Sequence, residues 1–258
     1  MLADAHIHLW DERRLAAYEA LRARHAIGSA LVVGYEGAPE HAGNNAAVLA
    51  WSRTRPWLVP FAYATAADGE PERLAALLDA GFRGVALYLD AAAARAFAAW
   101  PRETFALLVE RGAAISLNAP PEALAPLAAA DVACPLLISH LGLPGAHARP
   151  PARAEAEARL APLLALAAQP RVHVKLSGLY AISDPPHAWP HPQAQPFADA
   201  VLAAFGPERV VWGSDYPPAL DACSFAQLVD CRLLDGLPAT ARAAVMGGTL
   251  ERLLAASR

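Results

Sequence analysis

The sequence predicts a single-domain (β/α)8 TIM barrel that extends over residues 1–258. Eight short apolar runs alternate with segments rich in alanine, leucine and arginine, whose apolar residues are spaced as in amphipathic helices. No internal repeat or low-complexity linker divides the chain. Strands that are apolar along their length need helices over the sheet, and a barrel of this kind commonly has about 250 residues. An open, doubly wound sheet is the alternative architecture.

Each predicted strand is a short run dominated by valine, isoleucine, leucine and alanine. The eight runs are residues 2–9, 29–34, 57–62, 82–88, 113–118, 134–140, 171–177 and 209–214. The predicted helices are residues 14–25, 44–55, 70–81, 101–112, 121–131, 155–169, 196–206 and 239–257. The longest irregular stretch, 183–196, is rich in proline, so we expect a semi-rigid loop near the active end of the barrel, either simply solvated or acting as a substrate lid.

The composition excludes several classes of protein. Hydrophobic residues make up 55% of the chain and charged residues 18%, which is sufficient for a large core. The net charge of −4 and the isoelectric point near 6.1 give no basic surface for nucleic acid, so we expect no nucleic-acid partner. The longest apolar run, 160–168, is too short to cross a membrane.

The expected location is the cytoplasm. The first residues lack a basic segment followed by an apolar one, which is the pattern of a signal peptide. The three cysteines, Cys134, Cys223 and Cys231, have neither CxxC spacing nor the even count of a disulfide framework, so we expect buried, reduced thiols. The oligomeric state is not predicted.

The segment DAHIHLW at the start of the chain carries the first functional signal. Because successive side chains on a strand point to opposite faces, His6 and His8 should share one face and Ala5, Ile7 and Leu9 the other. Neutral imidazole is the commonest protein metal ligand and a frequent acid or base near neutral pH. A pair on one face therefore indicates a metal or catalytic site, provided that further polar groups join it.

Further polar residues lie near the carboxyl ends of the other predicted strands, where the active sites of barrels are built. In chain order these are Tyr88, Asn118, His140, Lys175, Ser177 and Asp215. Lys175 and Ser177 share a strand face, and a lysine between buried faces is costly without a partner or a function. His173 shares that face but lies nearer the strand start, so we interpret it as structural.

Four motifs, DAHIHLWD, SHLGLPG, HVKLSGLY and VVWGSDYPP, occur in this order along the chain. Together they resemble the amidohydrolase superfamily, in its amidohydrolase-2 branch of lactonases and related decarboxylases. The likeness is greatest to the group of 2-pyrone-4,6-dicarboxylate lactonases and sugar lactonases. GFRGVAL at 81–87 and MGGTLERLL at 246–254 extend the resemblance over essentially the whole chain.

The resemblance implies a barrel with catalytic roles for His6, His8, His140 and Asp215. In metal-using relatives these positions surround one divalent ion, usually zinc, whereas other members of the lactonase group work without metal. The fourth strand carries Tyr88 where a lysine or glutamate would bridge two ions, and the fifth ends in Asn118 instead of histidine. The resemblance therefore indicates one divalent ion at most, with zinc as the candidate cofactor.

The predicted function is hydrolysis of a lactone or related cyclic ester of a small molecule. Asp215 would act as general base on water, and His6, His8 and His140 would stabilise the oxyanion directly or through a metal ion. Lys175 would bind substrate, and the remaining pocket residues would be Ser177, Tyr88, Asn118, Trp10 and Trp189. Because Lys175 is the only basic residue placed at the site, a neutral or monoanionic substrate is favoured.

Three alternatives remain open from the sequence. One is a metal-dependent decarboxylase of the same superfamily, and another is a lyase that forms a Schiff base on Lys175. The third is a degenerate barrel that only binds a small acid. A serine hydrolase is disfavoured because no GxSxG occurs and Ser139, next to His140 in a strand, should face the opposite side.

Overall fold

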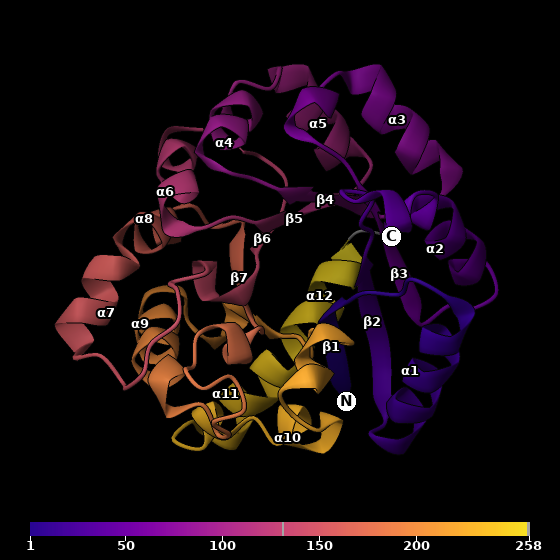
Figure 1. Cartoon of the computed structure of the whole chain (residues 1–258). Helices are drawn as coiled ribbons and strands as arrows, with labels where there is room; N and C mark the ends of the chain where they lie inside the picture. Colours follow the sequence, from indigo (N-terminus) through magenta and orange to yellow (C-terminus); the bar gives the residue numbers. More distant parts are fainter. Residues whose placement is uncertain (131, 257–258) are drawn as a thin grey trace.

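The computed structural model describes residues 1–130 and 132–256, and it confirms the predicted barrel. Eight parallel strands pair in sequence order from β1 to β8, which excludes the doubly wound alternative (Figure 1). Their bounds are β1 Leu2–Ile7, β2 Ile27–Val33, β3 Leu58–Tyr63, β4 Gly84–Tyr88, β5 Ala114–Asn118, β6 Leu136–Ile138, β7 Val172–Leu176 and β8 Val210–Trp212. Every predicted strand is present, and most are shorter than the apolar run that predicted them.

The helices form an outer layer around the strands (Figure 1). Their bounds are α1 Glu12–Arg24, α2 Asn44–Ser52, α3 Pro71–Ala80, α4 Ala91–Ala98, α5 Arg102–Glu110, α6 Pro121–Leu124, α7 Arg153–Arg159, α8 Ala161–Ala165, α9 Gln195–Phe205, α10 Phe225–Val229, α11 Ala239–Ala243 and α12 Thr249–Ala256. Short 3₁₀ turns fill many of the connections, including Pro39–His41, Ala125–Ala129 and Leu179–Ala181.

Several helix predictions differ from the structure in length or continuity. The predicted helix 155–169 is divided into α7 and α8 next to Pro162, whose ring and missing N–H are incompatible with a helix interior. The helix predicted over 239–257 is interrupted at Gly247, where the backbone is extended. The predicted ends at residues 131 and 257 lie outside the described residues. Helix α4 was not predicted; Asp90 caps its start by accepting hydrogen bonds from Ala92 N and Ala93 N.

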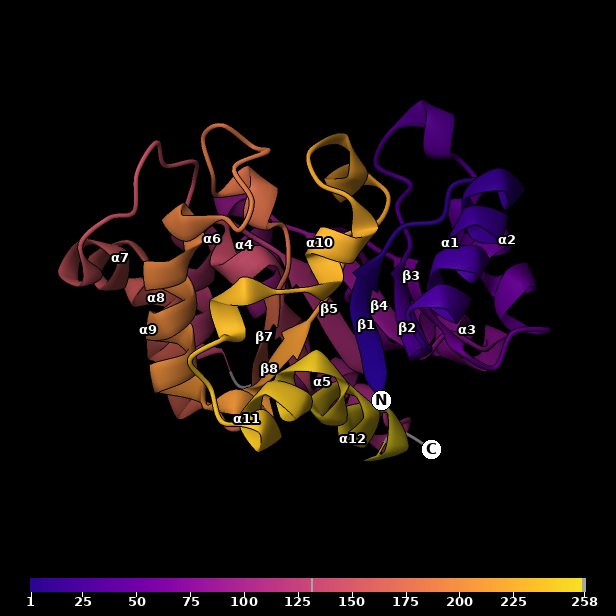
Figure 2. The same cartoon turned by 90° about the horizontal axis from the view of Figure 1, so that it is seen from below.

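The barrel interior is apolar at the end where the chain starts. Side chains from alternate strand positions meet there with Leu250 of α12, which lies across the end of the barrel where the chain starts (Figure 2). This interior cluster consists of Ala3, Ala5, Leu31, Val33, Phe61, Ala86, Ala114, Leu137, Val211 and Leu250. The other end of the barrel, which we call the mouth, carries the long connections (Figure 2).

A bulge in β1 aims the two histidines into the barrel. The prediction that Ala5 shares a face with Ile7 and Leu9 is wrong, because Ala5 packs in the interior cluster while Ile7 and Leu9 pack in the outer core. The pairing with β2 shifts register between Asp4 and Ile7. Because a bulge re-aims the side chains that follow it, His6 and His8 face the interior above the apolar layer.

The barrel closes where β1 meets the end of β8. His8 N donates to Tyr216 O over 2.6 Å, and Asp215 N donates to His6 O over 2.8 Å. Asp4 completes this seam, accepting hydrogen bonds on Oδ1 from Ser214 N at 2.8 Å and from His6 N at 3.2 Å. The closure therefore fixes the backbone of the segment with His6 and His8 relative to the segment with Asp215.

Asp4 is completely buried, and its second carboxyl oxygen also has a partner. Tyr18 of α1 donates its phenol proton to Asp4 Oδ2 over 2.9 Å. Burial raises the pKa of Asp4 to about 6, although its hydrogen bonds act in the opposite direction. The carboxyl group thus joins β1, β8 and α1 inside the protein.

All three cysteines are free and buried, as expected from their spacing. Among the described residues, no helix has both the length and the apolar character needed to cross a membrane.

Replacing Asp4 by alanine should lower the free energy of unfolding by roughly 3 kcal/mol, because three buried donors would lose their acceptor. Urea denaturation followed by circular dichroism measures this loss. Asp79→Ala is the control, since that carboxylate pairs with Arg111 on the surface and should contribute little. Equal effects of the two substitutions would contradict the role assigned to Asp4.

Candidate active site

The four residues singled out by the motifs meet at the mouth of the barrel. Asp215 Oδ1 lies 3.6 Å from His6 Nε2 and 3.8 Å from His8 Nε2, and the two histidine nitrogens are 3.2 Å apart. His140 approaches the other carboxylate oxygen, with Nδ1 4.0 Å from Asp215 Oδ2. All four side chains are buried or nearly so. Residues more than 200 positions apart therefore form one compact cluster.

The histidines are held as neutral imidazoles. Burial lowers the pKa of His6 and His140, and it lowers that of His8 to about 4 despite the opposing effect of Asp215. His8 Nδ1 lies 3.0 Å from Val33 O, an acceptor, so this nitrogen carries the proton and Nε2 presents a lone pair to the cluster. A neutral imidazole fixed in this way is suited to bind a metal ion or accept a proton.

His140 is positioned by backbone geometry just beyond β6. It has a left-handed conformation with φ of 56°, and its Nδ1 lies 3.0 Å from Ser177 Oγ. Gly178, with φ of 64°, passes so close that a Cβ there would lie 2.5 Å from the imidazole. Ser177 therefore orients His140, a candidate catalytic side chain.

Ser139 does not face away from the cluster, so that expectation was wrong. Its Oγ lies 3.4 Å from His6 Nδ1. The prediction assumed that the strand continues through residue 140, but β6 ends at Ile138 and strict alternation ends with it.

Lys175 lies beneath the cluster, inside the barrel. Its side chain is fully buried, with Nζ 2.7 Å from Ser116 Oγ and 3.1 Å from His6 Nδ1. Burial lowers the pKa of this amine to about 7, against the opposing effects of Asp215 and Asp4. The amine is fully buried against Ser116 and His6, whereas contact with substrate and a Schiff base both need an amine that substrate can reach.

Asp215 has a partner that the sequence reasoning missed. Tyr180, in the turn after β7, donates its phenol proton to Asp215 Oδ2 over 2.9 Å. Burial and the nearby carboxylate raise the pKa of Tyr180, so the phenol remains protonated. The residue stands within the motif HVKLSGLY, but its direction depends on a turn that the motif alone does not define.

Aromatic side chains line one side of the mouth. Trp10 stacks between His8 and His41, at 5.9 Å and 4.9 Å between ring centroids, and Tyr35 contacts Tyr88 at 5.0 Å. Within the described part of the chain, Trp10 Nε1 and the Tyr88 hydroxyl are buried without a hydrogen-bond partner. Both predicted pocket residues thus offer unused donors beside the cluster.

Asn118 ends β5 directly beside Tyr88, its partner in the register of the sheet. This position agrees with its predicted place at the mouth.

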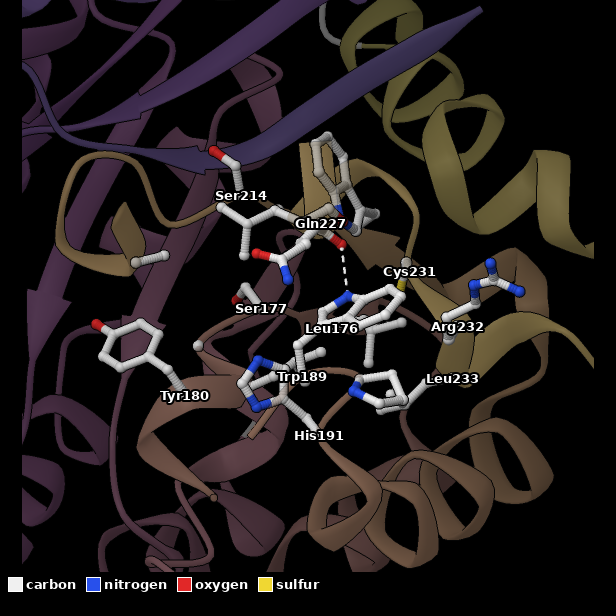
Figure 3. Close-up of a pocket in the computed structure, with 17 residues that line it drawn as sticks. Leu176, Ser177, Tyr180, Trp189, His191, Ser214, Gln227, Cys231, Arg232 and Leu233 are labelled. Carbon is white, nitrogen blue, oxygen red and sulfur yellow. Dashed lines mark hydrogen bonds between the residues drawn. The ribbon is translucent and has the colours of Figure 1, made fainter. Parts of the chain in front are cut away.

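Trp189 lines a small cavity next to the cluster (Figure 3). Its indole N–H donates to Gln227 O over 3.2 Å, and the guanidinium of Arg232 lies 5.8 Å from the ring centroid. Tyr180 and Ser177 border the same cavity on the side of the catalytic residues. Trp189 therefore lines a cavity that adjoins the cluster, and its predicted role in the substrate pocket stays a prediction.

The cluster has the spacing of a mononuclear metal site. One ligand atom each from His6, His8 and Asp215 lies within 4.8 Å of the others. Tetrahedral zinc with bonds of about 2.0–2.1 Å requires ligand atoms roughly 3.4 Å apart, close to the separations given above. The lone pair of His8 Nε2 also points to the shared space. The residues present therefore fit one divalent ion, with His140 beside it.

A family model for amidohydrolases matches residues 3–255. The chain belongs to the amidohydrolase family. The motif resemblance and the assignment as a hydrolase of the amidohydrolase superfamily are thereby confirmed.

Relatives of this amidohydrolase include lactonases. An L-fucono-1,5-lactonase from Burkholderia multivorans is 41% identical over 105 residues, which is 37% of this chain and 34% of that protein. A zinc-bound amidohydrolase structure from the same species is 24% identical, covers 99% of both chains and has a TM-score of 0.77. A structure titled as a putative 2-pyrone-4,6-dicarboxylic acid hydrolase from Pseudomonas putida is 23% identical, with a TM-score of 0.74 and coverage of 99% and 97%.

More distant amidohydrolases have the same fold with a different reaction. A 5-carboxyvanillate decarboxylase from Sphingomonas paucimobilis is 11% identical, with a TM-score of 0.64 and 98% coverage of both chains. The fold alone therefore does not select hydrolysis over decarboxylation.

The stability of this amidohydrolase should depend on pH through His8. Its pKa is about 4 in the folded chain against 6.5 in the unfolded chain, so unfolding takes up a proton below pH 6.5. The contribution of His8 to the free energy of unfolding should fall by roughly 2 kcal/mol from about pH 7 to about pH 5.

Urea denaturation of the wild type and of His8→Asn at both pH values isolates this effect. Because the pKa of Asp4 is raised in the folded protein, its contribution to the free energy of unfolding increases on acidification. This increase is the same in the wild type and the variant. The wild type should lose more stability on acidification than the variant, and parallel pH dependences would contradict a neutral, buried His8.

Proposed function

We propose that this amidohydrolase hydrolyses a lactone or related cyclic ester of a small molecule. The observation that carries the proposal is the convergence of one carboxylate, Asp215, with the Nε2 atoms of His6 and His8 at 3.6 and 3.8 Å. Hydrolysis of an ester by water requires a general base close to polar groups that stabilise the developing charge, and this cluster contains both. The partial sequence matches to lactonases support the same reaction class.

The reaction is a water attack followed by ring opening. Asp215 Oδ1 accepts a proton from the attacking water, whose oxygen forms a bond to the lactone carbonyl carbon. The carbonyl oxygen then carries negative charge, which an imidazole N–H of His6 or His140 stabilises, whereas His8 presents only a lone pair on Nε2. Collapse of this intermediate breaks the ring C–O bond, and Asp215 returns the proton to the leaving alkoxide.

His6, His8 and Asp215 would hold a divalent ion, with zinc as the candidate. When bound, such an ion supplies a Lewis acid that polarises the carbonyl and acidifies water. Their spacing and the lone pair of His8 support this assignment.

The groups around the mouth favour an uncharged or singly charged, hydroxyl-bearing substrate. Lys175 is sequestered beneath His6, and Arg14 beside Trp10 is paired with Asp11. The unused donors, Trp10 Nε1 and the Tyr88 hydroxyl, suit hydroxyl or carbonyl oxygens of a ring that stacks on aromatic side chains. Sugar-derived lactones have this chemistry, whereas a dicarboxylate would need basic partners.

Acid release from a panel of sugar lactones and 2-pyrone-4,6-dicarboxylate, followed with a pH indicator, tests the proposed reaction. Asp215→Asn should reduce turnover by about 10²–10⁴-fold, because the near-isosteric amide cannot accept the proton of water. Asp199→Asn on the surface of α9 is the matched control and should keep full activity. Absence of release from every lactone would favour the decarboxylase or the non-catalytic binding barrel, which CO₂ release and ligand titration then separate.

Zinc binding can be measured separately by competition with a chromophoric chelator. The wild type should bind one ion, and His8→Ala should weaken binding by more than about 100-fold because a ligand is lost. His173→Ala is the control, since its Nδ1 faces Arg171 O at the start of β7, away from the cluster. Equal zinc affinity in all three proteins would exclude the assigned ligand set.

A further inference from the structure

We propose that Tyr180 is a positioning residue for Asp215, and that the loop 179–194 holds it in place instead of covering the substrate as a lid. This inference rests on the proposed role of Asp215 as the base. It concerns a residue that is not among the site residues predicted from the sequence.

The two oxygens of Asp215 have separate surroundings. Oδ1 faces the Nε2 atoms of His6 and His8, whereas Oδ2 accepts the phenol proton of Tyr180 at 2.9 Å. Asp215 has a left-handed backbone with φ of 57°, so its side chain leaves a buried turn beyond β8 in a direction that no regular strand fixes. The phenol therefore selects which oxygen faces His6 and His8.

The loop that carries Tyr180 is bound to the segment after β8, the same segment that carries Asp215. Trp189 Nε1 donates to Gln227 O over 3.2 Å, and His191 Nε2 lies 3.2 Å from Cys223 Sγ. Figure 3 shows Trp189 and His191 among the side chains that line the cavity, which Tyr180 also borders. Together with the Tyr180 contact, these interactions join the two connections at three points.

The base of the loop is also fixed by internal contacts. His191 Nδ1 lies 3.0 Å from Ser183 Oγ, and both residues are buried. Ile182 O accepts from His147 N, and Asp184 N donates to His147 O, each at 2.9 Å. Polar contacts at residues 182–184, 189 and 191 therefore hold the loop, and a lid that opens for substrate would have to break them.

The test compares Tyr180→Phe, Trp189→Phe and the double variant with the lactone that the wild type turns over. Tyr180→Phe should lower kcat by about 10–100-fold with KM within about twofold, as expected for loss of a group that orients a reacting side chain. Trp189→Phe should lower kcat less. Because Trp189 acts through Tyr180, it should have no further effect in the double variant.

Tyr216→Phe is the matched control, since its hydroxyl donates to Arg14 O, outside the cluster. A rise in KM with unchanged kcat in Tyr180→Phe would assign the phenol to substrate binding and overturn the proposal. Independent, multiplying effects of Tyr180 and Trp189 would overturn the role of the loop.

Crystal structures of the wild type and Tyr180→Phe give a readout that does not need the lactonase reaction. The carboxylate of Asp215 should have one orientation in the wild type and a rotated or divided one in the variant. If the wild type hydrolyses no lactone, the proposed reaction fails, and this comparison alone decides the positioning role. An unchanged carboxylate would overturn it.

Discussion

The seam between β1 and β8 is the constraint on which the candidate active site depends. A bulge in β1 turns His6 and His8 into the barrel, and it leaves a backbone N–H that the ladder does not use. Asp4 accepts that N–H together with Ser214 N, so one buried carboxyl group stabilises the bulge and the turn that leads to Asp215. The structural carboxyl group of Asp4 and the proposed base, Asp215, are thus held by the same closure of the barrel.

Strand β7 and the turn that follows it supply hydrogen-bond partners for the candidate catalytic residues. Lys175 contacts His6, Ser177 contacts His140 and Tyr180 contacts Asp215. The contacts with His6 and Asp215 use Nδ1 and Oδ2, which leaves Nε2 of His6 and Oδ1 of Asp215 to face each other. The polar side chains of the segment HVKLSGLY thus orient the cluster from one side.

The barrel and the four central residues could be predicted from the sequence because the patterns that indicate them do not depend on the exact backbone geometry. Alternating apolar runs identify strands, and histidines at strand ends identify the mouth. The errors arose where the backbone departs from regular geometry. Ala5 was assigned to the wrong face because of the bulge, and Ser139 because β6 ends early. Lys175 was placed at the mouth since strand position shows the face of a side chain but not its depth.

The distance along the chain between the two sides of the seam has a consequence for assembly. Asp4 and Ser214 are separated by 210 residues, so their contact carries the high loop-closure entropy of long-range pairing. An amino-terminal fragment that contains both histidines of β1 lacks the carboxylate with which they act. The cluster therefore forms only after the chain has been synthesised as far as Asp215 and this segment has paired with β1.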